Sequence, residues 1–138
     1  MNRLSESLSA CVRKLETLHA RHAADAGVIL VQVAQMARIN NSAGTAAGDA
    51  VLDEIGRRLE NFASDEFGQG SCVDRLDGPR FLIVPSTPMS LGALRAQERA
   101  LHVALAEPIV GDPNGRLSIR IAAALITRDE SVAEQLRN

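Results

Sequence analysis

The order of apolar patterns along this chain predicts an α+β fold, a two-layer sandwich in which helices flank a central antiparallel sheet. Apolar residues spaced three and four apart, typical of amphipathic helices, alternate with short apolar runs of strand length. An Asp77-Gly78 pair between two of these runs indicates a tight hairpin, and therefore antiparallel pairing. The 138 residues contain no internal linker rich in Gly, Ser or Pro, so we expect one domain with one core.

The first half of the chain is expected to form two long helices and a strand. Apolar residues recur at helical spacing between Leu4 and Leu18. The continuous apolar run at residues 27–33 predicts a buried central strand, and one helical turn is expected over residues 34–41. Thr45 is expected to cap the next helix. The apolar face of that helix would be formed by Val51, Leu52, Ile55, Leu59 and Phe62.

The second half is expected to form the hairpin, one helix and a final strand. A loop rich in glycine and acidic residues at 64–70 precedes strands expected at 71–76 and 81–85. Residues 90–106 have the apolar spacing of a helix. Residues 116–127 alternate and then become wholly apolar, which predicts a strand that enters the core.

The composition argues against several classes of function. Fifteen basic and seventeen acidic residues give a net charge of −2, which disfavours a nucleic-acid binder, and three Phe without Trp or Tyr leave few stacking platforms. Without a signal peptide or a membrane-spanning apolar run, we expect a cytoplasmic location and no membrane insertion. The cysteines and histidines lack metal-ligand spacing. These residues are Cys11, Cys72, His19, His22 and His102.

Five stretches of the sequence, in order, resemble motifs of the GGDEF family, the diguanylate cyclase-like domains of bacterial signalling. Residues 75–81 are R-L-D-G-P-R-F, where the family pattern is R-x-G-G-[DE]-E-F. Residues 32–41 (Q-V-A-Q-M-A-R-I-N-N) match D-x-D-x-F-K-x-I-N-D, and residues 44–49 (G-T-A-A-G-D) match G-H-x-x-G-D. Asn2-Arg3 stands at the end of the family's L-x-N-R, and residues 118–122 (S-I-R-I-A) resemble S-I-G-I-A. The resemblance implies a ferredoxin-like, palm-type sheet.

The resemblance also implies a cyclase site that has lost its chemistry. Family members join two GTP molecules into cyclic di-GMP with magnesium ions that are held by carboxylates. In this chain the two aspartates of D-x-D are Gln32 and Ala34, the hairpin carboxylate is Pro79, and its acidic neighbour is Arg80. None of these side chains supplies an anionic oxygen. We therefore expect no bound metal, no cofactor and no cyclase activity.

Three residues remain as candidates for nucleotide binding. In the family, the residues at the positions of Asn40 and Asp49 recognise the guanine edge, and the glycine at the position of Gly78 allows a phosphate to approach closely. Each residue also has a purely structural explanation. Asn40 stands where a helix would end, Asp49 lies in the first turn of a helix, and Gly78 makes the hairpin turn.

The resemblance places the end of the chain just before the family's final helix. We therefore expect a single domain over residues 1–138 that lacks the final helix and strand of the family. The product-inhibition motif R-x-x-D is absent, because residues 68–71 are G-Q-G-S. A face exposed by such an end favours a homodimer or docking to a protein partner or an adjacent EAL-type domain. Residues 104–110 resemble a segment found in proteins that combine GGDEF and EAL domains.

These observations lead to four hypotheses for function. The first is a catalytically inactive GGDEF-like domain that serves as a regulatory or protein-interaction module in cyclic di-GMP signalling. The alternative is an allosteric sensor that binds GTP or GDP through Asn40 and Asp49 without turnover. An active cyclase would need substitute ligands such as Glu54 or Asp77. An unrelated ferredoxin-like domain would owe its motifs to chance.

Overall fold

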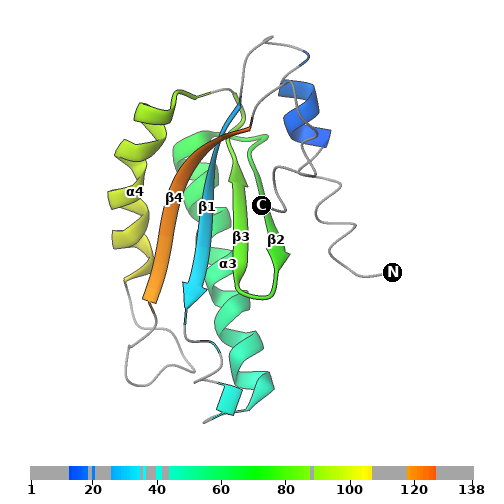
Figure 1. Ribbon diagram of the computed structural model, residues 1–138, viewed down its shortest axis with the longest axis vertical. Coiled ribbons are helices and arrows are strands. Elements are labelled where there is room, and N and C mark those ends of the chain that lie inside the picture. The colour runs from blue at the N-terminus through cyan, green and yellow to red at the C-terminus, as the bar shows by residue number, and fades with distance from the viewer. Residues whose placement is uncertain are drawn as a thin grey trace.

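A computed structural model describes residues 13–18, 20, 26–34, 36, 40–41, 44–87, 89–106 and 118–126. It contains a four-stranded sheet in the order β2-β3-β1-β4, in which every neighbouring pair is antiparallel (Figure 1). This architecture confirms the predicted α+β fold. The elements are β1 (Ala26–Ala34), α3 (Thr45–Phe67), β2 (Cys72–Asp77), β3 (Arg80–Val84), α4 (Leu91–Leu105) and β4 (Ser118–Ile126).

β1 lies in the middle of the sheet and fixes the register of its neighbours. It pairs with β4 along its whole length, from Ala26 opposite Ile126 to Ala34 opposite Ser118. On its other edge, Ile29 lies opposite Ile83 of β3. All residues of β1 except Gln32 are apolar and four of the nine are β-branched, which suits a strand with neighbours on both edges and side chains packed on both faces.

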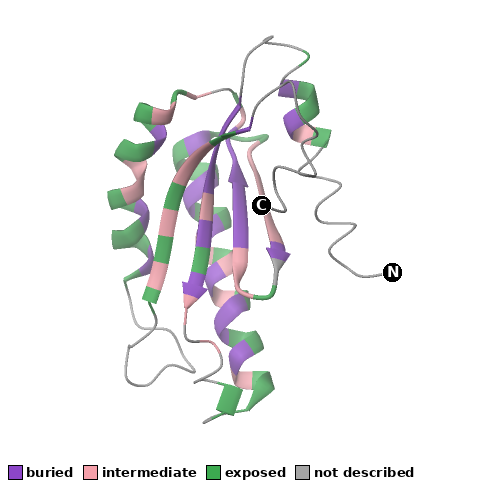
Figure 2. Ribbon diagram, viewed as in Figure 1, coloured by how far each residue is buried: buried purple, intermediate pink, exposed green. Residues whose placement is uncertain are grey.

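One face of the sheet packs against α3 and α4. Figure 1 shows α3 passing behind the strands, and Figure 2 shows that buried residues concentrate on β1, β3 and the side of α3 that meets them. Because side chains alternate along a strand, every second residue of β1 points to this face. The core here contains Ile29, Val31, Val33, Phe81 and Ile83 from the sheet, together with Val51, Ile55, Leu59, Leu94 and Leu101 from the helices.

The opposite face, which we call the outer face, is covered at one end by the helical segment at residues 13–18. Leu15 and Leu18 of this segment are buried against it. Burial of one such side chain contributes about 1.5–3 kcal/mol. The strand residues in this second cluster are Ala26, Val28, Leu76, Leu82, Val84 and Ile126.

The outer edge of β4 meets a side chain of α4. The backbone N–H of Ala123 donates a hydrogen bond to the Glu98 carboxylate, with 3.0 Å between nitrogen and oxygen. A carboxylate bound to a strand edge in this way occupies a donor that could otherwise pair with another chain.

The structure corrects three details of the prediction for β1 and α3. Residues 64–67, predicted as loop, continue α3, because Phe67 is buried and its carbonyl accepts a hydrogen bond from the Ser86 hydroxyl. The N-cap of α3 is Gly44 rather than Thr45, and no side chain caps the helix. Ala34, predicted in a helical turn, instead ends β1, because it pairs with Ser118.

The hairpin also differs slightly from the prediction. β2 extends through Asp77, so the turn is formed by Gly78 and Pro79. Several predicted features lie outside the described residues: the helix between Leu4 and Val12, Asn2-Arg3, Cys11, His19, His22 and the end of the chain. Among the described helices, none is both long and apolar enough to cross a membrane.

Candidate functional site at the hairpin end of the sheet

Sheet register places three polar residues in one row across the outer face. Gln32 of β1 lies opposite Arg80 of β3 and, on its other edge, opposite Arg120 of β4. Gln32 follows Leu30 by two positions, Arg80 precedes Leu82 by two, and Arg120 precedes Ala124 by four. Because these apolar residues belong to the outer-face cluster, alternation directs the three polar side chains to the same face. We call Arg80, Gln32 and Arg120 the polar row.

The hairpin turn is fastened to β1 beside this row. The N–H of Val33 donates a hydrogen bond to the carbonyl of Pro79, with 2.9 Å between the two atoms. Gln32 and Ala34 flank Val33 in β1, and Arg80 follows Pro79. The structure therefore brings the four predicted degenerate positions together at one end of the sheet.

The chemistry of this corner does not suit a divalent cation. Its side chains are an amide, a methyl group, a pyrrolidine ring and a guanidinium, whereas Mg²⁺ prefers carboxylate oxygens. Within the described ranges, no group of three or more His, Cys, Asp or Glu residues could hold a metal ion.

A cavity of about 260 Å³ opens on the outer face at the polar row. Leu30, Leu76 and Ala122 give it an apolar floor, and all three members of the polar row line it. Val31 and Phe81 complete the lining. Arg120 was not among the site residues predicted from the sequence. The sequence does contain a signal for Arg120, because it stands in S-I-R-I-A (residues 118–122) where the family pattern S-I-G-I-A has glycine.

The candidate guanine residues gather at the start of α3. The Asn40 carbonyl accepts a hydrogen bond from the Gly44 N–H at 3.0 Å, and the Asn40 side-chain oxygen lies directly over Gly48. A Cβ at position 48 would overlap that oxygen, so the absence of a side chain there makes room for Asn40. Asp49 follows, and it is exposed like Asn40.

Gly78 belongs to the hairpin rather than to this group. Its φ of 29° lies in the region that favours glycine, and a Cβ built there would meet no atom within 4 Å. The open space is compatible with an approaching ligand, and the positive φ by itself explains the residue as a turn former.

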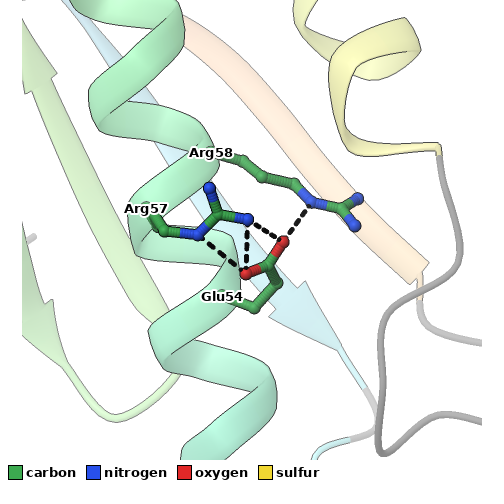
Figure 3. A network of polar contacts seen from close by, with 3 residues as sticks. All are labelled: Glu54, Arg57 and Arg58. Carbon is green, nitrogen blue, oxygen red and sulfur yellow. Dashed lines mark hydrogen bonds and ion pairs between the residues drawn. The ribbon is translucent and has the colours of Figure 1, made fainter.

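Glu54, a suggested substitute metal ligand, is bound instead by two arginines of α3 (Figure 3). Its carboxylate accepts hydrogen bonds from Arg57 at 2.6–2.9 Å and from Arg58 at 2.9 Å. These bonds, first from Arg57 and then from Arg58, lower the pKa of Glu54, and the bond to Glu54 raises the pKa of Arg57. The negative charge of the Glu54 carboxylate is therefore offset by two arginines of the same helix.

A second cavity, of about 270 Å³, lies where α3 leads into β2. It occupies the place where the family resemblance would put the product-inhibition motif. Among the described residues its charged lining residue is Glu60, and the Lys14 ammonium lies nearby, 3.7 Å from a Cβ built on the lining residue Gly70. The other lining residues are Ala63, Ser64, Gly68, Gln69, Gly70, Ser71, Cys72 and Val73.

The chain matches one known protein family over most of its length. The family described as "Diguanylate cyclase, GGDEF domain" matches residues 4–138. No curated protein matches the chain.

Solved structures of GGDEF domains have the same fold. The GGDEF domain of YfiN, also called TpbB, from Pseudomonas aeruginosa is 24% identical, with a TM-score of 0.71 over 99% of this chain and 83% of that chain. An EAL/GGDEF domain protein from M. capsulatus is 26% identical, with a TM-score of 0.65 over 100% and 86%. Diguanylate cyclase SiaD from Pseudomonas aeruginosa, solved with its activator SiaC, is 16% identical, with a TM-score of 0.74 over 99% and 53%.

Proposed function

This chain belongs to the GGDEF diguanylate cyclase family, and on that premise we propose that it is a catalytically inactive member that serves as a regulatory or protein-interaction module in bacterial cyclic di-GMP signalling. The observation that carries the proposal is the polar row, in which Gln32 lies between two arginines at the position where the family holds metal. The remaining degenerate positions, Ala34 and Pro79, lie beside it.

Electrostatics explain why this corner would not support cyclase chemistry. A metal-bound triphosphate needs anionic ligands that offset the charge of the metal and orient the reacting oxygens. Here the amide of Gln32 is neutral, and Arg80 adds a positive charge that repels a divalent cation. Arg57 and Arg58 compete with any cation for the carboxylate of Glu54, which disfavours Glu54 as a substitute ligand.

The similar proteins support a role in assembly. SiaD was solved in complex with an activator protein, and the M. capsulatus protein combines EAL and GGDEF domains. A domain that has lost its metal ligands but keeps the fold can still present the surfaces through which such proteins or domains are regulated. We therefore propose that this chain binds and regulates a protein partner or an adjacent EAL-type domain.

The decisive experiment is a turnover assay on the purified protein with GTP and either Mg²⁺ or Mn²⁺. We expect no cyclic di-GMP, while an active GGDEF domain assayed in parallel forms it. Expression of the chain in a bacterium that makes cyclic di-GMP should nevertheless change the cellular concentration of that dinucleotide. Product formation by the purified chain, abolished by a change at the hairpin such as Gly78→Val, would refute the proposal.

A second candidate function is a guanine-nucleotide sensor without turnover. The observation in its favour is the Asn40 side chain, which lies over Gly48 and beside the exposed Asp49 at the start of α3. An amide and a carboxylate can pair with the acceptor and donors of the guanine edge. Calorimetry should then detect GTP but not ATP, and Asp49→Ala should abolish the difference. Equal affinity for both nucleotides would exclude this function.

A further inference from the structure

In the described part of the chain, the side chain of Glu98 occupies the outer backbone edge of β4. The N–H of Ala123 donates its hydrogen bond to the Glu98 carboxylate, so this N–H points away from β1. Backbone groups alternate in direction along a strand, and the register of β4 against β1 is continuous from end to end. The N–H and C=O groups of Ile119, Ile121 and Leu125 therefore point to the same outer edge.

Burial along β4 agrees with an edge that is open among the described residues. Ile126 is the buried residue of β4, and the other eight are half-buried or exposed, whereas most residues of β1 are buried. The side chain of Leu125 is 43% exposed, although it is large and apolar. Proteins usually cover or protect a long apolar edge of this kind, because it pairs readily with another chain.

We propose that the outer edge of β4 is a docking site for one extended, acidic segment of a protein partner, and that Glu98 is the latch that closes it. Open strand edges bind extended segments through backbone hydrogen bonds, and the side chains beside the edge select the segment. The inference rests on the proposed role in protein interaction and states which surface and which kind of partner that role would use.

The side chains beside this edge favour an acidic segment. Arg95 lies three residues before Glu98 on α4 and His102 lies four residues after it, so both share the side of the helix that reaches β4. Arg120 of β4 is exposed on the outer face. The two arginines attract carboxylates, and His102 adds to this attraction when it is protonated. A displaced Glu98 would also remain within reach of Arg95 and His102, which lowers the cost of opening the latch.

The position of α4 selects a single strand rather than a second copy of this chain. Because Glu98 reaches Ala123, α4 lies beside the outer edge of β4, and Figure 1 shows α4 beyond β4 on that side. A strand added to this edge would have α4 behind it. Two copies joined edge to edge would instead be related by a two-fold axis normal to the sheet, which would bring both α4 helices into the same space.

The first test is amide hydrogen exchange in the protein alone, followed by NMR. The amides that point to the outer edge, at Ile119, Ile121 and Leu125, should exchange much faster than those of Ala122 and Ala124, which point to β1. Slow exchange at all five positions would show that the edge already has a partner, and would overturn the proposal.

Binding is tested with a synthetic peptide of nine residues, the length of β4, in which glutamate and valine alternate. The expected result is a saturable change in the amide signals of β4, with exchange slowed at Ile121 and Leu125. A peptide with lysine in place of glutamate should bind more weakly, and one that is N-methylated along its backbone should not bind. Equal binding of the glutamate and lysine peptides, or binding of the N-methylated peptide, would overturn the proposal.

Glu98→Ala tests the latch. This substitution removes the carboxylate that competes for the Ala123 N–H, so the glutamate peptide should bind about tenfold more tightly, which corresponds to one charge-assisted hydrogen bond. Glu66→Ala removes the same charge from an exposed position of α3 and is the matched control, which should bind like the wild type. Equal tightening in both variants would show a general effect of charge and overturn the proposal.

Leu125→Pro tests the backbone contact. Proline removes an N–H that points outward, and edge strands tolerate it because the pairing with the inner neighbour is kept. This variant should lose peptide binding, whereas Leu125→Ala, which removes the same side chain but keeps the N–H, should retain it. Equal binding by the two variants would overturn the proposal. If Leu125→Pro does not fold, as the spectrum of the free protein would show, the Glu98→Ala comparison still decides.

Failure of this inference can be told apart from failure of the proposed function, because peptide binding is measured without GTP. Formation of cyclic di-GMP by the purified chain would refute the proposed function and leave the peptide results standing. A chain that changes cellular cyclic di-GMP but binds no peptide at β4 would overturn this inference alone.

Discussion

Gly27 and Gly56 show how strongly the effect of one methyl group depends on its neighbours. A Cβ at Gly27 in β1 would lie 2.6 Å from the backbone oxygen of Met89 and 2.5 Å from a methyl of Leu94. A Cβ at Gly56 in α3 would make an ordinary 3.4 Å contact with the ring of Phe81. Glycine is therefore required for space in the strand, whereas in the helix it only lowers helix propensity.

We predict opposite effects on stability for the two alanine substitutions. Gly27→Ala should lower the free energy of unfolding by about 1–3 kcal/mol, because a backbone carbonyl cannot move aside as a side chain can. Gly56→Ala, the control, should raise it by up to about 1 kcal/mol through helix propensity. Urea denaturation measures both, and equal effects of the same sign would show that neither contact governs the outcome.

The Glu54 carboxylate predicts a pH dependence of stability. Hydrogen bonds from Arg57 and Arg58 lower its pKa in the folded protein below its ordinary value, so their contribution is fully present above that value and is lost as the pH falls through the lowered pKa. Glu54→Gln should therefore lower the unfolding midpoint at pH 7 and flatten its decline below about pH 4. Thermal denaturation from pH 7 to pH 3 measures the effect. Parallel curves for variant and wild type would contradict it.

The sequence predicted most of the candidate corner, but not all of it. Gln32, Ala34, Pro79 and Arg80 were predicted from their motif positions, and the structure places them together. Arg120 was missed, because its proximity to Gln32 depends on the register of two strands nearly ninety residues apart in the chain. Sequence periodicity indicates the face of a strand but does not reveal which residue lies opposite another.

At the scale of elements, predictions succeeded where apolar spacing was continuous. β1, β3 and β4 lie within two residues of their predicted bounds, because alternating or unbroken apolar runs mark buried strands. The predicted end of α3 was wrong. Ser64, Asp65 and Glu66 resemble loop residues, yet they occupy the exposed side of a helical turn whose other side buries Ala63 and Phe67.

The helical segment at residues 13–18 should matter to stability despite its short length. Leu15 is fully buried in the outer-face cluster, so Leu15→Ala should lower the free energy of unfolding by about 2–5 kcal/mol. Glu16→Ala, one residue along on the exposed side, should change it by less than about 0.5 kcal/mol. Chemical denaturation compares the two. A similarly small effect of Leu15→Ala would mean that this segment does not take part in the cooperative core.

For the molecule as a whole, the predicted architecture holds in the described residues, with α3 and α4 on one face of the sheet and the helical segment at residues 13–18 on the other. The α+β class follows from the order of the elements. The order of strands in the sheet, β2-β3-β1-β4, does not follow from periodicity, since it depends on which edges of β1 each strand occupies.

We predict that Mg²⁺ does not stabilise the folded protein. A ligand that binds only the native state raises the unfolding midpoint by mass action, and the polar row offers a cation no anionic oxygen. Millimolar MgCl₂ should therefore leave the thermal midpoint unchanged relative to an NaCl solution of equal ionic strength. A concentration-dependent rise specific to Mg²⁺ would show a metal site and contradict the assignment of the corner.

The central place of β1 has a consequence for how the chain is made. Its long edge against β4 joins Ala26 to Ile126, which are 126 − 26 = 100 positions apart. At a synthesis rate of about 5–20 residues per second, the ribosome needs roughly 5–20 s to deliver the second strand after the first. During that interval one edge of an apolar strand has no native partner, which is the condition under which nascent chains aggregate or recruit chaperones. Folding of this domain should therefore be completed only after β4 has emerged from the ribosome.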